Sequence, residues 1–154
     1  MKSIMDTQEK VIKAQKAAMS KKSYRGPKYL FQQMHVFDDI IDDKRLARYS
    51  KQLEICFIRG RHIGITITAS TQRFRAIMPS ARISNNHEIL FKIRNSLDKK
   101  AIFEEQTALI SEAVLEHYYQ KMLRIPYGFM WLDKKAEPDQ LLHIGFEPAV
   151  NVDI

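Results

Sequence analysis

Two short apolar runs, each followed by polar residues, constrain the fold of this chain most strongly. Residues 34–38 form the first run, whose last residue Asp38 is followed by Asp39, and residues 63–70 form the second, which Gln72 follows. Alternating β-branched and apolar residues in runs of this length predict β-strands. A helix predicted between the runs makes them neighbours in a parallel sheet. Ligands bind at the carboxyl ends of such strands, so we expect both aspartates and the glutamine along one edge of the sheet.

Hydrophobic periodicity predicts the other elements. Helices are predicted at residues 4–19, 44–58 and 100–123, and further strands at 88–94, 128–133 and 141–146. The last helix is expected to bury Ile102, Leu109, Ala113 and Met122. Since Pro138-Asp139 lies between the last two strands, they are expected to form a hairpin.

These elements together predict an α/β fold with a mainly parallel sheet, flanking helices and a C-terminal β-hairpin. The length of 154 residues fits one domain or part of a larger one. We expect a single domain over 1–154, with a basic helix and loop (1–30), a core with the motifs (33–125) and the hairpin (127–147). Cys56 lies among apolar residues of a predicted helix, where a buried packing role is expected.

Positive charge is concentrated near the amino terminus. The net charge is +7, and residues 1–30 contain eight lysines and arginines against two acidic residues. Such a surface attracts nucleic acid, with Lys21, Lys22 and Arg25 of the loop 20–28 as candidate contacts. A solvated helix face and a basic loop would explain the same charges, and both explanations remain open. The sequence has neither a signal peptide pattern nor an apolar run of membrane-spanning length.

The residues at the strand ends suit nucleotide hydrolysis. A carboxylate at a strand end can hold the Mg²⁺ that bridges two phosphates, which suits Asp38. A second group must orient or deprotonate the attacking water, which suits Asp39, while Gln72 could sense the terminal phosphate. Arg61 opens the second strand at its opposite end and could reach a neighbouring subunit's nucleotide, with Arg59 as a rival. A helix cap, a loop glutamine and a surface arginine are the structural alternatives.

A longer pattern resembles a known family. Phe37-Asp38-Asp39, the segment from Gly60 to Arg73, then 81–86 and 89–93, resemble the FtsK–HerA superfamily of DNA-pumping ATPases. Within it, the pattern is most similar to the genome-packaging ATPases of large double-stranded DNA viruses, the poxvirus-like branch. The resemblance implies part of a RecA-like P-loop NTPase core that uses ATP and Mg²⁺. It further implies double-stranded DNA, a homo-oligomeric ring and a capsid or portal component as partners, in the host cytoplasm, a viral factory or the virion.

The resemblance also implies residue roles. Asp38 would be the magnesium-side carboxylate and Asp39 the water-activating one. Gln72 would be the sensor, Arg61 the arginine that acts in trans, and Arg82 a second candidate for that arginine.

One part of the family pattern is missing. None of the five glycines is followed by lysine, so the chain has no Gly-x-x-x-x-Gly-Lys-Ser/Thr loop for phosphates. We therefore expect the carboxyl-terminal portion of an ATPase, or a degenerate relative, that is inactive alone. The alternatives are a non-enzymatic basic module for nucleic-acid binding or assembly, and a metal-dependent nuclease that uses Asp38, Asp39, Asp42 and Asp43.

Overall fold

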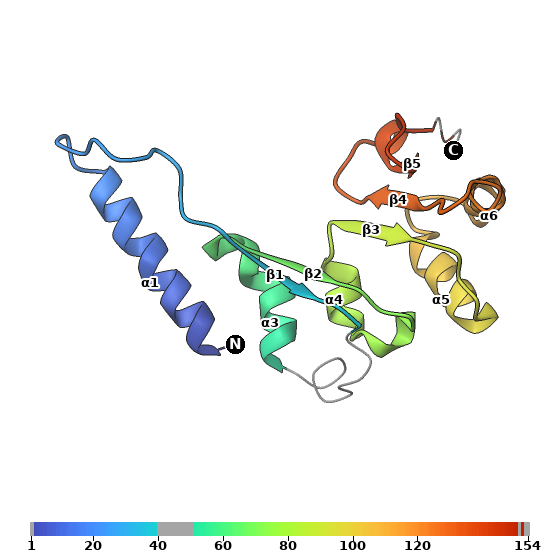
Figure 1. Ribbon diagram of the computed structural model, residues 1–154, viewed down its shortest axis with the longest axis horizontal. Coiled ribbons are helices and arrows are strands. Elements are labelled where there is room, and N and C mark those ends of the chain that lie inside the picture. The colour runs from blue at the N-terminus through green and yellow to red at the C-terminus, as the bar shows by residue number, and fades with distance from the viewer. Residues whose placement is uncertain (1, 40–50, 151, 153–154) are drawn as a thin grey trace. The chain divides into compact units, whose positions relative to one another are not determined.

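The chain divides into two compact units, residues 1–84 and 85–154. The computed structural model describes residues 2–39, 51–150 and 152 (Figure 1). Each unit has its own helices and its own sheet, and the expectation of a single domain stays a prediction. None of the described helices has the length and the apolar character needed to cross a bilayer.

The first unit is a parallel strand pair with helices. Its described elements are α1 (Lys2–Met19), β1 (Gln33–Phe37), α3 (Lys51–Arg59), η2 (Gly60–Ile63), β2 (Ile65–Ala69), η3 (Phe74–Ala76) and α4 (Pro79–Ser84). The predicted helix 4–19 and the two predicted strands are thus confirmed, with shifted ends. Of the predicted helix 44–58, the structure describes the part from Lys51, and Asp42 and Asp43 lie outside the described residues.

β1 and β2 pair in parallel, from Gln33 opposite Ile65 to Phe37 opposite Ala69. One face of the pair is covered, because Phe37 and Ala69 pack against a buried cluster of Leu53 from α3, Ala81 from α4 and Met78, which directly precedes α4. Burial of this apolar surface drives the strands and helices together. Cys56 of α3 is also buried, as predicted, and burial raises the pKa of its thiol.

Two glutamines of α1 attach the helix to the segment that enters β1. Gln8 donates a hydrogen bond to the carbonyl oxygen of Phe31 over 2.9 Å, and the side-chain oxygen of Gln15 accepts one from the Phe31 amide over 2.7 Å. The backbone amide and carbonyl groups of Phe31 are therefore both hydrogen-bonded by side chains of α1. Gly64 turns the chain into β2 with a φ of 69°, and a Cβ there would lie 3.0 Å from the Phe31 oxygen. This close approach favours glycine.

The second unit is an antiparallel sheet with two helices. Its described elements are β3 (His87–Leu90), α5 (Ser96–Gln106), α6 (Glu112–Met122), β4 (Met130–Asp133), η4 (Pro138–Gln140) and β5 (Leu142–Ile144). The strand order is β3-β4-β5, so the predicted hairpin is confirmed. The parallel arrangement holds for β1 and β2, whereas β3 pairs antiparallel with β4. β3 buries Glu88 and Leu90 on one face, beside Met130 and Leu132 of β4.

The prediction of one helix over 100–123 was wrong. Two helices occupy this stretch, and the chain turns between them at residues 107–111. Ser111 caps α6 by accepting a hydrogen bond from the Val114 amide, a preferred role for serine. The break rotates the following residues, so Ile110 and Leu115 are buried, whereas Leu109 and Ala113 are exposed.

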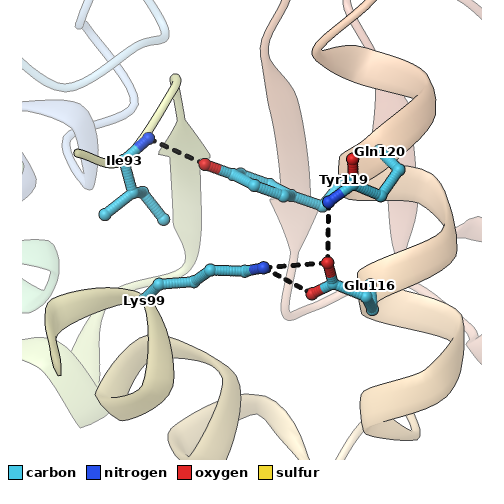
Figure 2. Close-up of polar contacts among 5 residues, drawn as sticks. All are labelled: Ile93, Lys99, Glu116, Tyr119 and Gln120. Atoms are coloured by element: carbon cyan, nitrogen blue, oxygen red, sulfur yellow. Dashed lines mark hydrogen bonds and ion pairs between the residues drawn. The ribbon is translucent and has the colours of Figure 1, made fainter. Parts of the chain in front are cut away.

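An ion pair joins α5 to α6. Lys99 Nζ lies 2.6 Å from a carboxylate oxygen of Glu116, and Gln120 donates to the other oxygen over 2.8 Å (Figure 2). The hydroxyl of Tyr119 accepts a hydrogen bond from the Ile93 amide nearby, over 2.8 Å. The hydrogen bond from Lys99, and then that from Gln120, lower the pKa of Glu116.

A pH titration tests this ion pair. A carboxylate with a lowered pKa stabilises the fold above its unfolded-state pKa, and this stabilisation is lost as pH falls through the folded-state pKa. Between about pH 6 and pH 3, the wild-type chain should lose about 0.5–1 kcal/mol more unfolding free energy than Glu116→Gln, a small effect because the carboxylate is 41% exposed. Urea unfolding at several pH values measures this difference. Equal pH dependence in the two proteins would contradict it, and Glu147→Gln serves as an exposed control.

Candidate functional site

The parallel register brings the residues after β1 and β2 to one edge of the sheet. The Ser70 amide donates to the Phe37 carbonyl oxygen over 2.8 Å, which continues the pairing past the last residue of β2. Asp38 and Asp39 therefore leave the sheet beside the segment that contains Ser70 and Gln72.

Four side chains at this edge form a hydrogen-bonded cluster. The Ser70 hydroxyl donates to Asp38 Oδ1 over 2.5 Å and accepts a hydrogen bond from the Asp39 amide over 3.0 Å. Gln72 Nε2 donates to Asp39 Oδ2 over 3.2 Å. The structure thus brings together the three residues that the sequence placed at the strand ends, Asp38, Asp39 and Gln72. Their roles stay predictions.

The two neighbouring carboxylates differ in backbone conformation and in hydrogen-bond partner. Asp39 has a φ of 46°, in the left-handed region that aspartate tolerates better than most residues. One carboxylate contacts Ser70 and the other contacts Gln72. Two neighbouring acids with different partners can perform different tasks at one site.

The cluster has the donor set for a hard cation. Carboxylate and hydroxyl oxygens are ligands that Mg²⁺ prefers, and Asp38 and Ser70 are both exposed. Among the described residues, no group of three or more histidines, cysteines and acidic residues could hold a metal ion. A cation here would therefore take its remaining ligands from phosphate and water, as Mg²⁺ does when it is bound with a nucleotide.

Arg61 lies at the other end of β2. It is exposed on η2 and lines an open groove of about 780 Å³ with Arg59, His62 and two acidic residues of α1, Asp6 and Glu9. The five residues of β2 at about 3.3 Å each separate this groove from the strand ends by roughly 16 Å. The structure therefore does not bring Arg61 to Asp38, Asp39 and Gln72.

The second arginine candidate has contacts within its own unit. Arg82 Nη1 donates to the Ile77 carbonyl oxygen over 2.7 Å, and the guanidinium lies 4.7 Å from the centroid of the Phe74 ring. These contacts hold η3 to α4, which follow the segment of Gln72.

The nucleic-acid candidates Lys21, Lys22 and Arg25 are exposed in the loop after α1. Arg25 Nη1 donates to the carbonyl oxygens of Lys22 and Tyr24 over 3.2 and 3.3 Å. Its guanidinium is thereby oriented by the loop itself.

Sequence reasoning missed Ser70. Serine directly after a strand is common, and its contact with both aspartates depends on the register of β1 and β2. Ser70 lies two residues before Gln72, which could have marked it as part of the same site. Without the pairing of β2 with β1, however, its contact with Asp38 could not be inferred.

Comparisons with known proteins show the fold. No family model and no curated protein matches the chain. The chain is similar to solved structures of the genome packaging NTPase B204 from Sulfolobus turreted icosahedral virus 2, in complex with ATP-gammaS (TM-score 0.53, 18% identity, 88% of this chain and 59% of that chain) and with AMP (0.53, 19%, 94% and 63%). It is also similar to B204, the DNA-packaging ATPase from Sulfolobus Turreted Icosahedral Virus (0.53, 19%, 86% and 57%).

The chain spans about three fifths of the length of these structures. At such low identity the likeness shows the fold alone. It is a mixed α/β fold of the NTPase kind, with a parallel strand pair and an antiparallel sheet. The predicted fold class is confirmed, and membership of the FtsK–HerA superfamily stays a prediction.

Removal of the Ser70 hydroxyl tests the cluster. In Ser70→Ala, the Asp39 amide loses its acceptor, so its hydrogen exchange should be about fivefold faster, because one hydrogen bond contributes about 1 kcal/mol. Exchange measured by NMR on the folded protein reports this directly. Thr68→Val, on the exposed side of β2, should leave the Asp39 amide unchanged. An unchanged rate in Ser70→Ala would show that the hydroxyl does not hold Asp39.

Proposed function

We propose that this chain supplies the water-activating and phosphate-sensing part of a viral genome-packaging ATPase, which couples ATP hydrolysis to translocation of double-stranded DNA into a capsid. One observation carries the proposal: Asp38, Asp39 and Gln72 form one exposed cluster with Ser70 at the carboxyl ends of two parallel strands. Ligands of parallel sheets bind at this edge. The similarity in fold to the B204 packaging NTPases supports it.

Each residue of the cluster has a distinct proposed role. Asp39 accepts a proton from the attacking water, and Gln72, which already contacts Asp39, orients that water against the terminal phosphate. Asp38 and Ser70 would hold Mg²⁺, which neutralises charge on the phosphates when it is bound. The hydroxyl of Ser70 keeps Asp38 in place beside Asp39.

Arg61 is proposed to act on a neighbouring subunit. It lies at the end of β2 opposite to the cluster, so it is remote from the nucleotide of its own chain. In a homo-oligomeric ring, the same arginine can reach the nucleotide of the next subunit and stabilise charge in the transition state. Such a ring would enclose the duplex and dock on a capsid or portal component.

The phosphate-binding loop must come from outside these residues. About two fifths of each B204 structure has no counterpart in this chain. Without backbone amides and a lysine for the phosphates, the cluster alone gives little affinity for ATP. We therefore expect no hydrolysis by the 154 residues alone, and activity in the assembly that contains such a loop on the same polypeptide or on a partner.

Loss of the proposed base tests the function. In that complete assembly, Asp39→Asn should lower kcat at least about 100-fold, as removal of a general base does, and should change ATP affinity less than about threefold. Steady-state hydrolysis and ATP titration measure the two quantities. Asp139→Asn, an exposed aspartate of η4, is the matched control. Retained turnover in Asp39→Asn would refute the assignment of the base.

A mixing experiment extends this test to Arg61. Arg61→Ala and Asp39→Asn subunits should each be inactive alone. Mixed rings should recover part of the activity, because an intact Asp39 site can face an intact Arg61 of its neighbour. The absence of recovery would refute the action of Arg61 on a neighbouring subunit.

A second candidate function is non-enzymatic binding of nucleic acid. Residues 1–84 contain 17 lysines and arginines against 7 acidic residues, which favours a polyanion partner for this unit. Of the four aspartates in the metal-nuclease alternative, the structure describes Asp38 and Asp39. This alternative predicts DNA cleavage with Mg²⁺ or Mn²⁺.

Salt dependence separates these candidates. If Lys21, Lys22 and Arg25 contact phosphates, their replacement by glutamine should reduce the slope of log affinity against log salt by up to about 3, near 0.9 per contact. Gel shifts of duplex DNA at several salt concentrations, beside an ATP titration, measure this. Lys100, Lys121 and Lys135, exposed on the other unit, provide the matched triple control. An unchanged slope in the first triple variant would remove the loop from the interface.

A further inference from the structure

The outer face of the β3-β4-β5 sheet is lined with rings. Ile89 lies opposite Trp131, and Trp131 lies opposite His143, whose ring is stacked on the indole at 4.5 Å. Phe129 contacts Phe91 at 5.7 Å and Phe146 at 5.1 Å between ring centroids. We refer to this surface as the aromatic face; its members are Ile89, Phe91, Phe129, Trp131, His143 and Phe146.

The aromatic face is not needed for the core of its own unit. The alternate residues of the same strands, Leu90, Met130, Leu132 and Leu142, form the buried side. In contrast, Ile89 is 52% exposed, Phe91 59% and Phe146 88%. Soluble proteins seldom leave contiguous large apolar groups in water, and aromatic groups of this kind are enriched in interfaces.

The first unit has an open face of its own. Met34 and Val36 of β1 are 63% and 65% exposed, and their neighbours Thr66 and Thr68 of β2 are exposed too. We refer to these four residues as the β1–β2 outer face. Parallel sheets are normally covered on both faces. Among the described residues of this unit, α3 and α4 cover the opposite face.

Charge distinguishes the two units and indicates which partner fits. Residues 85–154 contain 8 lysines and arginines against 11 acidic residues, so this unit is net acidic, whereas residues 1–84 are strongly basic. An acidic unit repels a polyanion, which argues against nucleic acid on the aromatic face. A partner with net positive charge and exposed apolar residues fits it, and the first unit of a second copy has an excess of ten positive charges together with the exposed Met34 and Val36.

We propose that the aromatic face of one copy packs against the β1–β2 outer face of a second copy. Each copy then uses two different surfaces, so the contact is heterologous and repeats from copy to copy into a ring or a filament. Apolar burial supplies affinity, and the opposite net charges of the two units supply attraction and orientation. The inference rests on the proposed function only in that a packaging motor needs several copies.

Complementary variants test this contact by sedimentation velocity, without nucleotide or DNA. The wild-type chain should associate between about 1 and 100 μM. Phe91→Thr with Phe146→Thr removes the aromatic face, and Met34→Thr with Val36→Thr removes the other face; each double variant alone should stay monomeric. An equimolar mixture should form dimers and nothing larger, because one intact face of each kind remains. Circular dichroism establishes that both double variants are folded.

Several results would overturn the proposal. These are a wild-type chain that stays monomeric at about 100 μM, a Met34/Val36 double variant that still associates through its aromatic face, and a mixture without dimers. Leu109→Thr and Ile83→Thr, exposed at 38% and 76%, should associate like wild type.

Two further measurements use the wild-type chain. Association should weaken as salt rises from about 0.05 to 0.5 M, since the attraction between oppositely charged units of two copies is screened. Association that stays equal or becomes stronger at high salt would exclude a second copy held by charge attraction. Labelled single-stranded DNA should bind equally to wild type and to the Phe91/Phe146 variant; selective loss in that variant would assign the rings to base stacking instead. Failure of the ATPase tests would leave all these results unaffected.

Discussion

The parallel pairing of β1 with β2 is the constraint on which the candidate site depends. Its last register pair, Phe37 with Ala69, fixes where the next residues of both strands lie. A shift by one residue would turn each side chain of a strand to the other face, and Ser70 would then lose its contacts with Asp38 and Asp39. The apolar residues on the covered face hold this register, because Phe37 and Ala69 both pack against the buried cluster of Leu53, Met78 and Ala81. The polar cluster is therefore positioned by the packing of apolar side chains.

The sequence was sufficient for this part of the fold because the information is local. β-branched runs identify the strands, and polar residues mark their ends. The same local reasoning failed between residues 100 and 123, where helix-forming residues continue through the turn at 107–111 and the cap at Ser111 decides the break. Local reasoning also did not predict the antiparallel pairing of β3, because its partner β4 follows two helices later in the chain.

Long-range polar contacts were the least predictable. Gln8 and Gln15 lie seven residues apart on α1, and nothing in their local sequence indicates that both bind Phe31. The role of Ser70 likewise follows from a residue 32 positions away. Such contacts need the register and the path of the chain, which are set by burial over the whole unit. Sequence patterns therefore located the ends of the strands, whereas the partners of each carboxylate came from the structure.

The separation of the acidic cluster from Arg61 along β2 has a physical consequence. The acidic cluster and Arg61 lie at opposite ends of one strand, roughly 16 Å apart for five residues. The Arg61 guanidinium cannot reach a group bound at Asp39 of the same chain, since the arginine side chain is shorter than the strand. If both groups act in hydrolysis, each active site must be completed by another copy. A chain that leaves apolar surface exposed on two units of unlike charge has the means to bring copies together, so assembly and catalysis would then depend on the same repeated contact.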